Sequence, residues 1–319
     1  MTRVAVVDCG TNSIRLLIAE AGPDGSLVEL ERRTEIVRLG QGVDATEEFH
    51  PDALTRTFVA TEAYAALVRD AGVPPGRVRF VATSASRDAR NREDFFAGIR
   101  QRLGVTPEVV SGDTEAALSF AGALSRFDRP VEPVLVVDIG GGSTELILGR
   151  PDGGVTAAVS LDIGSVRLTE RFLGAAPPAP GAVAAAAAHV DELLAHNGID
   201  FGAVGTWVGV AGTATTLAGV HLGLEHYDRA RVHGSLIPLT DLYALFDRLV
   251  ASTVGEIRAL PSMHPGRADV VTAGTLIAVR IADRLGHEGP GQQNTGVDGL
   301  RVSESDILDG AALELLHRT

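Results

Sequence analysis

Residues 134–150 read VLVVDIGGGSTELILGR and repeat residues 4–20, VAVVDCGTNSIRLLIAE, without a gap and at a constant spacing of 130 positions. In each copy a β-branched run ends in an aspartate, passes through a short Gly/Ser/Asn/Thr segment and re-enters an apolar run, which is typical of a tight β-hairpin. A glycine-rich turn lets backbone N–H groups approach an anion, and the aspartate at the strand end can hold a cation. The repeat therefore predicts two related halves whose turns form a cleft for a phosphate chain and a metal ion.

The composition is that of an ordinary soluble protein. With 319 residues, of which 45% are apolar and 22% charged, the chain is long enough to bury two cores. It shows no signal-peptide pattern and no apolar run of membrane-spanning length, so we expect a cytoplasmic protein with no membrane partner. The formal net charge of −13 disfavours nucleic acid as a partner. A polyanionic substrate would then need a locally positive cleft and a divalent cation.

Two residue types exclude further kinds of site. Cys9 is the one cysteine, which excludes an internal disulfide and a cysteine-based zinc cluster. Its counterpart in the repeat is Ile139, so we interpret Cys9 as a small buried apolar residue. All 28 basic residues are arginine. The absence of lysine excludes a Walker-type phosphate lysine and a Schiff base.

Strand-like and helix-like segments alternate along the chain. In the first half we expect strands at 4–8, 14–20, 27–40 and 78–86, helices at 51–71 and 88–104, and a strand–turn–helix unit at 108–124. After the repeated hairpin we expect strand–helix units at 157–174, 206–220, 268–286 and 299–318 and a helix at 183–198. This alternation predicts an α/β fold with central mixed sheets flanked by helices. The proline-containing break at 127–133 marks the expected domain boundary.

The strongest functional pattern is DIGGGSTE at residues 138–145. Three consecutive glycines carry a large conformational cost, and close approach of a ligand to backbone amides is the usual reason to keep them. Ser143 and Thr144 can add hydroxyl donors to phosphate oxygens, and Glu145 on the return strand can point back toward Asp138. The alternative is a hairpin without a ligand, which we disfavour because the turn at 8–13 repeats the layout.

Asp8 and Asp138 occupy equivalent positions of the repeat. Each alone could simply cap a turn. Two at matched positions favour a joint role in holding Mg²⁺, which prefers carboxylate and phosphate oxygens.

Glu115 and Arg87 are candidates on weaker grounds. Glu115 falls in the first turn of an expected helix, where the helix dipole alone favours a carboxylate, so the residue pattern leaves its role open. Arg87 follows a strand end and could reach a phosphate, or it could pair on the surface with Asp88 or Glu93.

At these residues the chain closely resembles the exopolyphosphatase and guanosine pentaphosphate phosphohydrolase family, within the superfamily that includes sugar kinases, heat-shock chaperones and actin. The matching segments run in family order from about residue 4 to residue 310: DCGTNSIRLLI, ATSASRDARN, VSGDTEAALSFAGAL, VVDIGGGSTELILG, SLDIGSVRLTE, GVAGTATTLAG and PGRADVVTAG.

The resemblance implies two actin-like (ribonuclease H-like) domains with a cleft between them, and Mg²⁺-dependent hydrolysis of terminal phosphoanhydride bonds. By the family's pattern Glu115 would be the general base that activates water, and Asp138 and Glu145 would hold the metal, with Asp8 as a further ligand from the repeat. Family members often carry two acidic residues at this point of the motif, whereas here Thr114 precedes Glu115. The phosphate-binding residues would be Asn12, Ser13, Gly141, Gly142, Ser143, Thr144 and Arg87, with Arg87 also taking part in catalysis.

Longer relatives add a C-terminal helical domain, so the resemblance also implies a short form. We expect a first domain at 1–127, a second at 128–303, and a final helix at about 304–317 that packs on the first domain. Less surface for distal phosphates should favour short polyphosphate.

The expected activity is release of orthophosphate from the ends of inorganic polyphosphate, with removal of the 5′ γ-phosphate of guanosine pentaphosphate as an additional activity. One alternative is a sensor that binds guanosine penta- or tetraphosphate without hydrolysis. Another is an ATP-dependent kinase, because GVAGTATTLAG could equally line a nucleotide pocket. The oligomeric state stays open, with a homodimer among the options.

Overall fold

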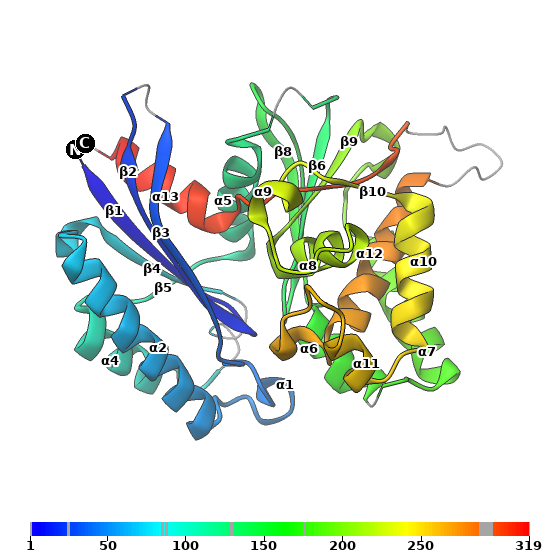
Figure 1. The fold of residues 1–319 in the computed structure, drawn as a ribbon, viewed down its shortest axis with the longest axis horizontal. Coiled ribbons are helices and arrows are strands. Elements are labelled where there is room, and N and C mark those ends of the chain that lie inside the picture. The colour runs from blue at the N-terminus through cyan, green and yellow to red at the C-terminus, as the bar shows by residue number, and fades with distance from the viewer. Residues whose placement is uncertain are drawn as a thin grey trace. The chain divides into compact units, whose positions relative to one another are not determined.

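The structure is a computed structural model that describes residues 2–23, 26–83, 86, 89–127, 130–174, 176–286 and 296–318. The chain forms two compact units, the first made of residues 1–125 and 306–319 and the second of residues 126–305. Each unit contains its own mixed β-sheet (Figure 1). Within the described ranges, no helix combines the length and the apolar character needed to cross a membrane.

The first unit has a five-stranded sheet in the order β3-β2-β1-β4-β5. β1, β2 and β3 form an antiparallel meander, and β4 and β5 continue the sheet parallel to β1. The strands are β1 (Arg3–Cys9), β2 (Ser13–Ala21), β3 (Leu27–Ile36), β4 (Val78–Ala82) and β5 (Glu108–Val109), and the helices are α1 (Val43–Thr46), α2 (Pro51–Asp70), η1 (Pro75–Arg77), α4 (Arg92–Leu103), α5 (Gly112–Leu124) and α13 (Ile307–His317).

Alternating side chains of β1 divide the core of the first unit into two layers. Ala5, Val7 and Cys9 belong to the core on the side of α2 and α4, whereas Val4 and Val6 pack with side chains of α5 and α13. This alternation follows from the period of two along a strand. Both faces of the sheet are therefore covered, as the fully buried pattern of β1 after Arg3 requires.

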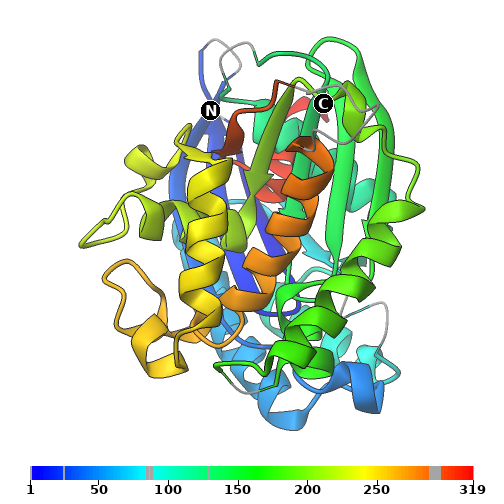
Figure 2. The same cartoon turned by 90° about the vertical axis from the view of Figure 1, so that its right-hand side faces the viewer.

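The second unit has a six-stranded sheet in the order β10-β11-β9-β6-β7-β8. α7, α12 and α10 lie side by side over one face of this sheet (Figure 2). The strands are β6 (Val134–Ile139), β7 (Thr144–Arg150), β8 (Gly154–Leu161), β9 (Thr206–Val210), β10 (Leu236–Pro238) and β11 (Gly299–Val302), and the helices are α6 (Ser165–Leu168), η2 (Thr169–Leu173), α7 (Pro180–Ala195), η3 (Phe201–Ala203), α8 (Ala211–His221), α9 (Arg229–Val232), α10 (Leu239–Val250), α11 (Val254–Arg258), η4 (Pro265–Arg267) and α12 (Val271–Gly286).

The predicted α/β class with two mixed sheets is confirmed, and so are both hairpins of the repeat. The expectation of a strand at the start of 268–286 was wrong, because η4 ends at Arg267 and α12 begins at Val271. The first residues of α12, from Val271 to Ile277, are all buried, and this short run resembles a buried strand in the sequence. The strand expected at 27–40 ends at Ile36.

Candidate functional site

In the first unit, three parallel strands end at the same edge of the sheet. Cys9 of β1 is level with Ala82 of β4, which is level with Val109 of β5. The turn of the first hairpin, Thr83 and the N-terminus of α5 follow these strand ends directly. The carboxyl edge of a parallel sheet is where α/β proteins bind ligands, so this edge gathers the candidates Asp8, Asn12, Ser13 and Glu115.

Asn12 and Ser13 lie in a turn held by backbone hydrogen bonds. The amide of Gly10 donates to the Ser13 carbonyl at 2.9 Å, and the Asn12 carbonyl accepts from Val37 and Arg38. Asn12 Oδ1 is buried and has no hydrogen-bond partner among the described residues. Because the amide oxygen and nitrogen are interchangeable in shape, rotating the amide presents Nδ2 to an anion instead.

Glu115 lies in the first turns of α5 and is 7% exposed. The helix begins there because Ser111 is extended and its hydroxyl accepts from the amide of Thr114 at 3.2 Å. Asp113, in the same turn, is exposed. α5 therefore carries one buried and one solvated carboxylate at its positive end.

Asp8 is buried in an ion pair with Arg15, its direct partner across β1 and β2. Arg15 donates from Nε at 3.0 Å and from Nη2 at 2.6 Å to the same oxygen, Oδ2, and from Nη1 to Asp306. Burial raises the pKa of Asp8, Arg15 lowers it, and Asp306 raises it. Oδ1 of Asp8 is buried without a hydrogen-bond partner in the described part of the chain.

The second hairpin places two carboxylates where the first has an ion pair. Asp138 of β6 is paired directly with Glu145 of β7, so both side chains lie on one face of the sheet. Asp138 is 6% exposed and Glu145 is 1% exposed. Ser160 of β8 is level with Glu145 and donates to its Oε1 at 2.8 Å. This face therefore presents two buried carboxyl groups side by side.

Residues 140–143, which we call the glycine turn, are held through their carbonyl groups. The Gly140 carbonyl accepts from Ser165, and the Gly141 carbonyl accepts from Val166 and Arg167. Within the described residues, the amides of Gly141, Gly142 and Ser143 donate no hydrogen bond. Successive amides of this kind are suited to an anion. The hydroxyl of Thr144 is engaged, because it donates to the Ile163 carbonyl at 2.7 Å.

α8 begins beside the glycine turn, since β9 is the parallel neighbour of β6. Thr213 donates from Oγ1 to the Ile139 carbonyl at 2.8 Å. Arg267 donates to the Gly212 carbonyl at 2.9 Å and to Thr216 Oγ1 at 2.8 Å. Ala211 joins β9 to α8 with φ 57°, a left-handed conformation that costs a non-glycine residue free energy and that often occurs at functional sites.

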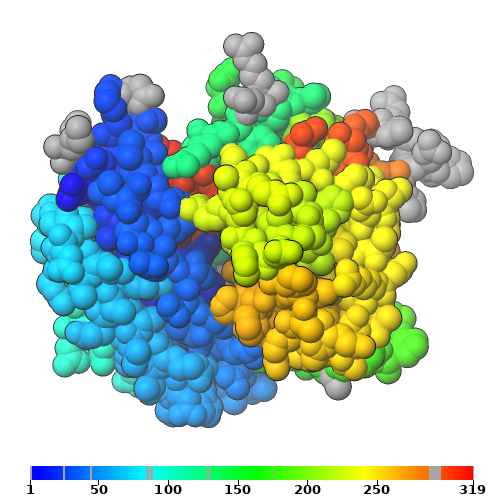
Figure 3. Space-filling model, viewed as in Figure 1, coloured from blue at the N-terminus to red at the C-terminus, as the bar shows by residue number. Residues whose placement is uncertain are grey.

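β11 is the parallel neighbour of β9, so it ends at the same edge of the second sheet as β6 and β9. Glu304 follows the end of β11. Tyr227 donates to Glu304, and Arg229 donates from Nε to it at 2.7 Å. The segment with α9 that contains Arg229 lies at the surface of the second unit (Figure 3). Desolvation and the negative charge of Glu304 raise the pKa of Tyr227 above its usual value.

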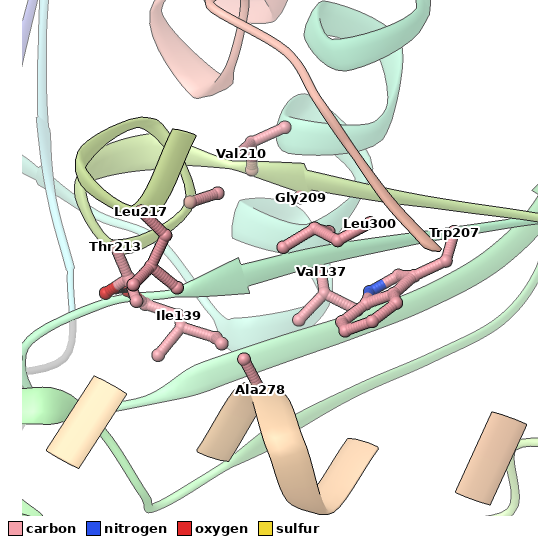
Figure 4. A pocket seen from close by; sticks show the side chains of 10 residues that line it. Val137, Ile139, Trp207, Gly209, Val210, Thr213, Leu217, Ala278 and Leu300 are labelled. Atoms are coloured by element: carbon pink, nitrogen blue, oxygen red, sulfur yellow. Dashed lines mark hydrogen bonds between the residues drawn. The ribbon is translucent and has the colours of Figure 1, made fainter. Parts of the chain in front are cut away.

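Two cavities near this sheet do not coincide with the glycine turn. One, of about 10 Å³, is enclosed by apolar side chains such as Val137, Trp207 and Leu300 (Figure 4). It has room for about one water molecule, so it is a packing defect of the core. The other, of about 300 Å³, is lined by Thr206 and Asp298 at the amino ends of β9 and β11, the opposite edge of the sheet.

The roles of Arg87 and the metal site stay predictions. Arg87 lies outside the described residues, so its two roles stay predictions. In the described ranges, no group of three or more His, Cys, Asp or Glu side chains is arranged to hold a metal ion. The pair Asp138 and Glu145 still fits Mg²⁺, because proteins commonly hold this ion through one or two carboxylates together with substrate phosphates and water.

Sequence reasoning missed several residues that build these sites. The residue patterns give no role to five residues within the family-like motifs: Arg15, Ser160, Gly164, Thr213 and Arg267. A signal for Arg15 was present, because it aligns with Glu145 in the repeat and carries the opposite charge. The other four act through contacts that are distant in sequence.

A comparison with protein-family models matches residues 17–305 to the Ppx/GppA phosphatase family. The chain belongs to the Ppx/GppA phosphatase family. A curated relative agrees with this family. The chain is 46% identical to "Exopolyphosphatase 2" of Mycobacterium tuberculosis over 99% of both chains.

Solved structures of similar proteins agree in fold. A crystal structure described as an exopolyphosphatase-like protein superimposes with a TM-score of 0.92 at 41% identity, covering 98% of this chain and 97% of that one. The Ppx/GppA family member of Aquifex aeolicus superimposes with a TM-score of 0.78 at 30% identity, with the same coverage. The hairpins and sheets described above are therefore those of this family.

Proposed function

We propose that this Ppx/GppA-family chain is an exopolyphosphatase that uses Mg²⁺ to release orthophosphate from the ends of short inorganic polyphosphate. The observation that carries the proposal is the direct pairing of Asp138 with Glu145 beside the glycine turn. Two adjacent buried carboxylates repel each other, and a divalent cation relieves that repulsion. The relative named "Exopolyphosphatase 2" supports the same activity.

The substrate would be held mainly by backbone groups and charge. When bound, Mg²⁺ would neutralise negative charge on the phosphate oxygens. The amides of Gly141, Gly142 and Ser143 would donate to phosphate oxygens, and Asn12 and Ser13 would do the same from the first hairpin. Thr144 is a weaker donor in this proposal because its hydroxyl is already engaged. Positioning and charge neutralisation account for most of the catalysis in phosphoryl transfer.

Glu115 would accept the proton of the attacking water at a carboxylate oxygen. Its low exposure supports this role, because a buried carboxylate is a better base than a solvated one. Asp8 stays a predicted metal ligand, with Oδ1 as the oxygen that Arg15 does not occupy.

The decisive variant is Glu115→Gln, which keeps the shape of the side chain and removes the base. We expect phosphate release from short polyphosphate with Mg²⁺ to fall by at least about 100-fold, while binding of the same polyphosphate persists. Asp113→Asn is the matched control, because it removes an exposed carboxylate from the same helix turn and should leave release near the wild-type rate.

Substrates are compared in the same phosphate-release assay. Short and long polyphosphate, guanosine pentaphosphate and ATP are each supplied with and without Mg²⁺. Release from no substrate would contradict the proposal and favour a guanosine penta- or tetraphosphate sensor. Transfer of phosphate from ATP to an added acceptor would favour a kinase instead.

A further inference from the structure

The N-terminal carboxylate of α13 reaches the first hairpin. Asp306 caps the helix, with Oδ1 accepting from the amide of Leu308 at 3.0 Å. Its other oxygen accepts from Arg15, whose remaining donors hold Asp8. The three side chains are between 5% and 14% exposed, so this chain of charges is shielded from solvent.

A second carboxylate of the same helix makes a similar ion pair, but with an arginine of β3. Asp309 completes the capping box with Asp306 and accepts from Arg32 at 2.8 Å. Arg32 also contacts Glu29 of β3 and makes no described contact with Asp8. The two capping carboxylates thus form equivalent ion pairs, of which only one reaches a predicted site residue.

α13 also contacts the helix that carries Glu115. A Cβ on Gly122 of α5 would lie 1.8 Å from the Asp306 carbonyl oxygen, and a Cβ on Gly310 would lie 2.0 Å from the Leu118 carbonyl oxygen. The two helix backbones therefore touch directly. The start of α13 is fixed against both the strand of Asp8 and the helix of Glu115.

We propose that Asp306 is a positioning residue for the reaction proposed above. It fixes the guanidinium of Arg15 on Oδ2 of Asp8, which holds the Asp8 side chain in one orientation and leaves Oδ1, which has no hydrogen-bond partner among the described residues, to the metal. The bidentate fork of Arg15 explains how one guanidinium can serve both carboxylates. The inference depends on the proposed function, because it concerns the rate of that reaction.

The test compares Asp306→Asn with Asp309→Asn in the full-length protein. Asparagine caps helices about as well as aspartate, so Asp306→Asn keeps the cap and weakens the hold on Arg15, although it also removes a charge that acts on Arg32 and Asp309. We expect kcat for phosphate release to fall about tenfold, as for other positioning contacts, with KM changed by less than about twofold. Asp309→Asn should lower the thermal midpoint of unfolding by about as much as Asp306→Asn does. It should leave kcat within about twofold of wild type.

Equal kcat values for the two variants would overturn the inference, because the contact would then serve only to dock α13. If Asp306→Asn does not fold, Arg15→Lys tests the same link, since lysine cannot bridge both carboxylates, and wild-type kcat in that variant would also overturn it. Wild-type protein that releases no phosphate would instead reject the proposed function, so the two failures are distinguishable.

Discussion

Gly164 touches the glycine turn with its own backbone. A Cβ at this position would lie 2.4 Å from the carbonyl carbon and oxygen of Gly141 and 2.6 Å from the amide of Gly142. Its backbone is extended, a conformation that any residue adopts, so the contact and not the dihedral angle requires glycine. The turn that would bind phosphate is thus shaped by a residue more than twenty positions away.

We therefore expect Gly164→Ala to destabilise the protein by about 1–3 kcal/mol, as overpacking does, and to lower kcat/KM for polyphosphate, because the glycine turn must shift. Denaturant unfolding and phosphate release measure the two effects. Gly181→Ala in α7 is the control, since nothing lies within 4 Å of its added Cβ. Equal stability of the two variants would show that the turn absorbs the added atom freely.

At the scale of elements, the two hairpins share one register but differ in charge. Asp8 faces Arg15 across β1 and β2, and Asp138 faces Glu145 across β6 and β7. The first hairpin supplies its own cation as a guanidinium. The second pairs two carboxyl side chains instead, which is why we propose the metal there.

Removing one of these charges should weaken Mg²⁺ activation. We expect Glu145→Gln to raise the Mg²⁺ concentration for half-maximal phosphate release by at least about tenfold, since each unit charge near a divalent ion contributes several kcal/mol. Gln keeps an oxygen that can accept from Ser160. Asp162→Asn is the control, because that carboxylate is largely exposed and pairs with Arg167. An unchanged midpoint in Glu145→Gln would place the metal elsewhere.

The second unit is formed by one continuous segment of the chain, whereas the first is formed by two. The second unit is continuous, from 126 to 305, whereas the first needs the distant segment 306–319. That segment supplies Ile307, Leu308, Ala311 and Ala312 to the core that covers one face of the first sheet. Arg79 and Arg77 also contact α13, through Glu314 and the Leu315 carbonyl.

We expect a fragment of residues 126–305 to unfold cooperatively on its own, because it contains its entire sheet and core. A fragment of residues 1–125 should lack a cooperative transition until a peptide of residues 306–319 is added. Circular dichroism during heating measures both. Cooperative unfolding of 1–125 alone would show that α13 is dispensable for the first unit.

The sequence alone determined the features that depend on neighbouring residues. The repeat, the alternation of side chains and the glycine pattern predicted both hairpins, the α/β class and the proximity of Glu145 to Asp138, because strand register and tight turns are set by residues a few positions apart. Cys9 was also interpreted correctly as a buried residue, and burial raises the pKa of its thiol.

Only the tertiary structure decided the contacts between distant segments. Arg15 and Asp306 are 291 positions apart, and Arg267 and Gly212 are 55 apart. The first residues of α12 are all buried, so the start of this helix resembled a strand in the sequence. Such contacts depend on which faces pack together in three dimensions, and no local period in the sequence records that choice.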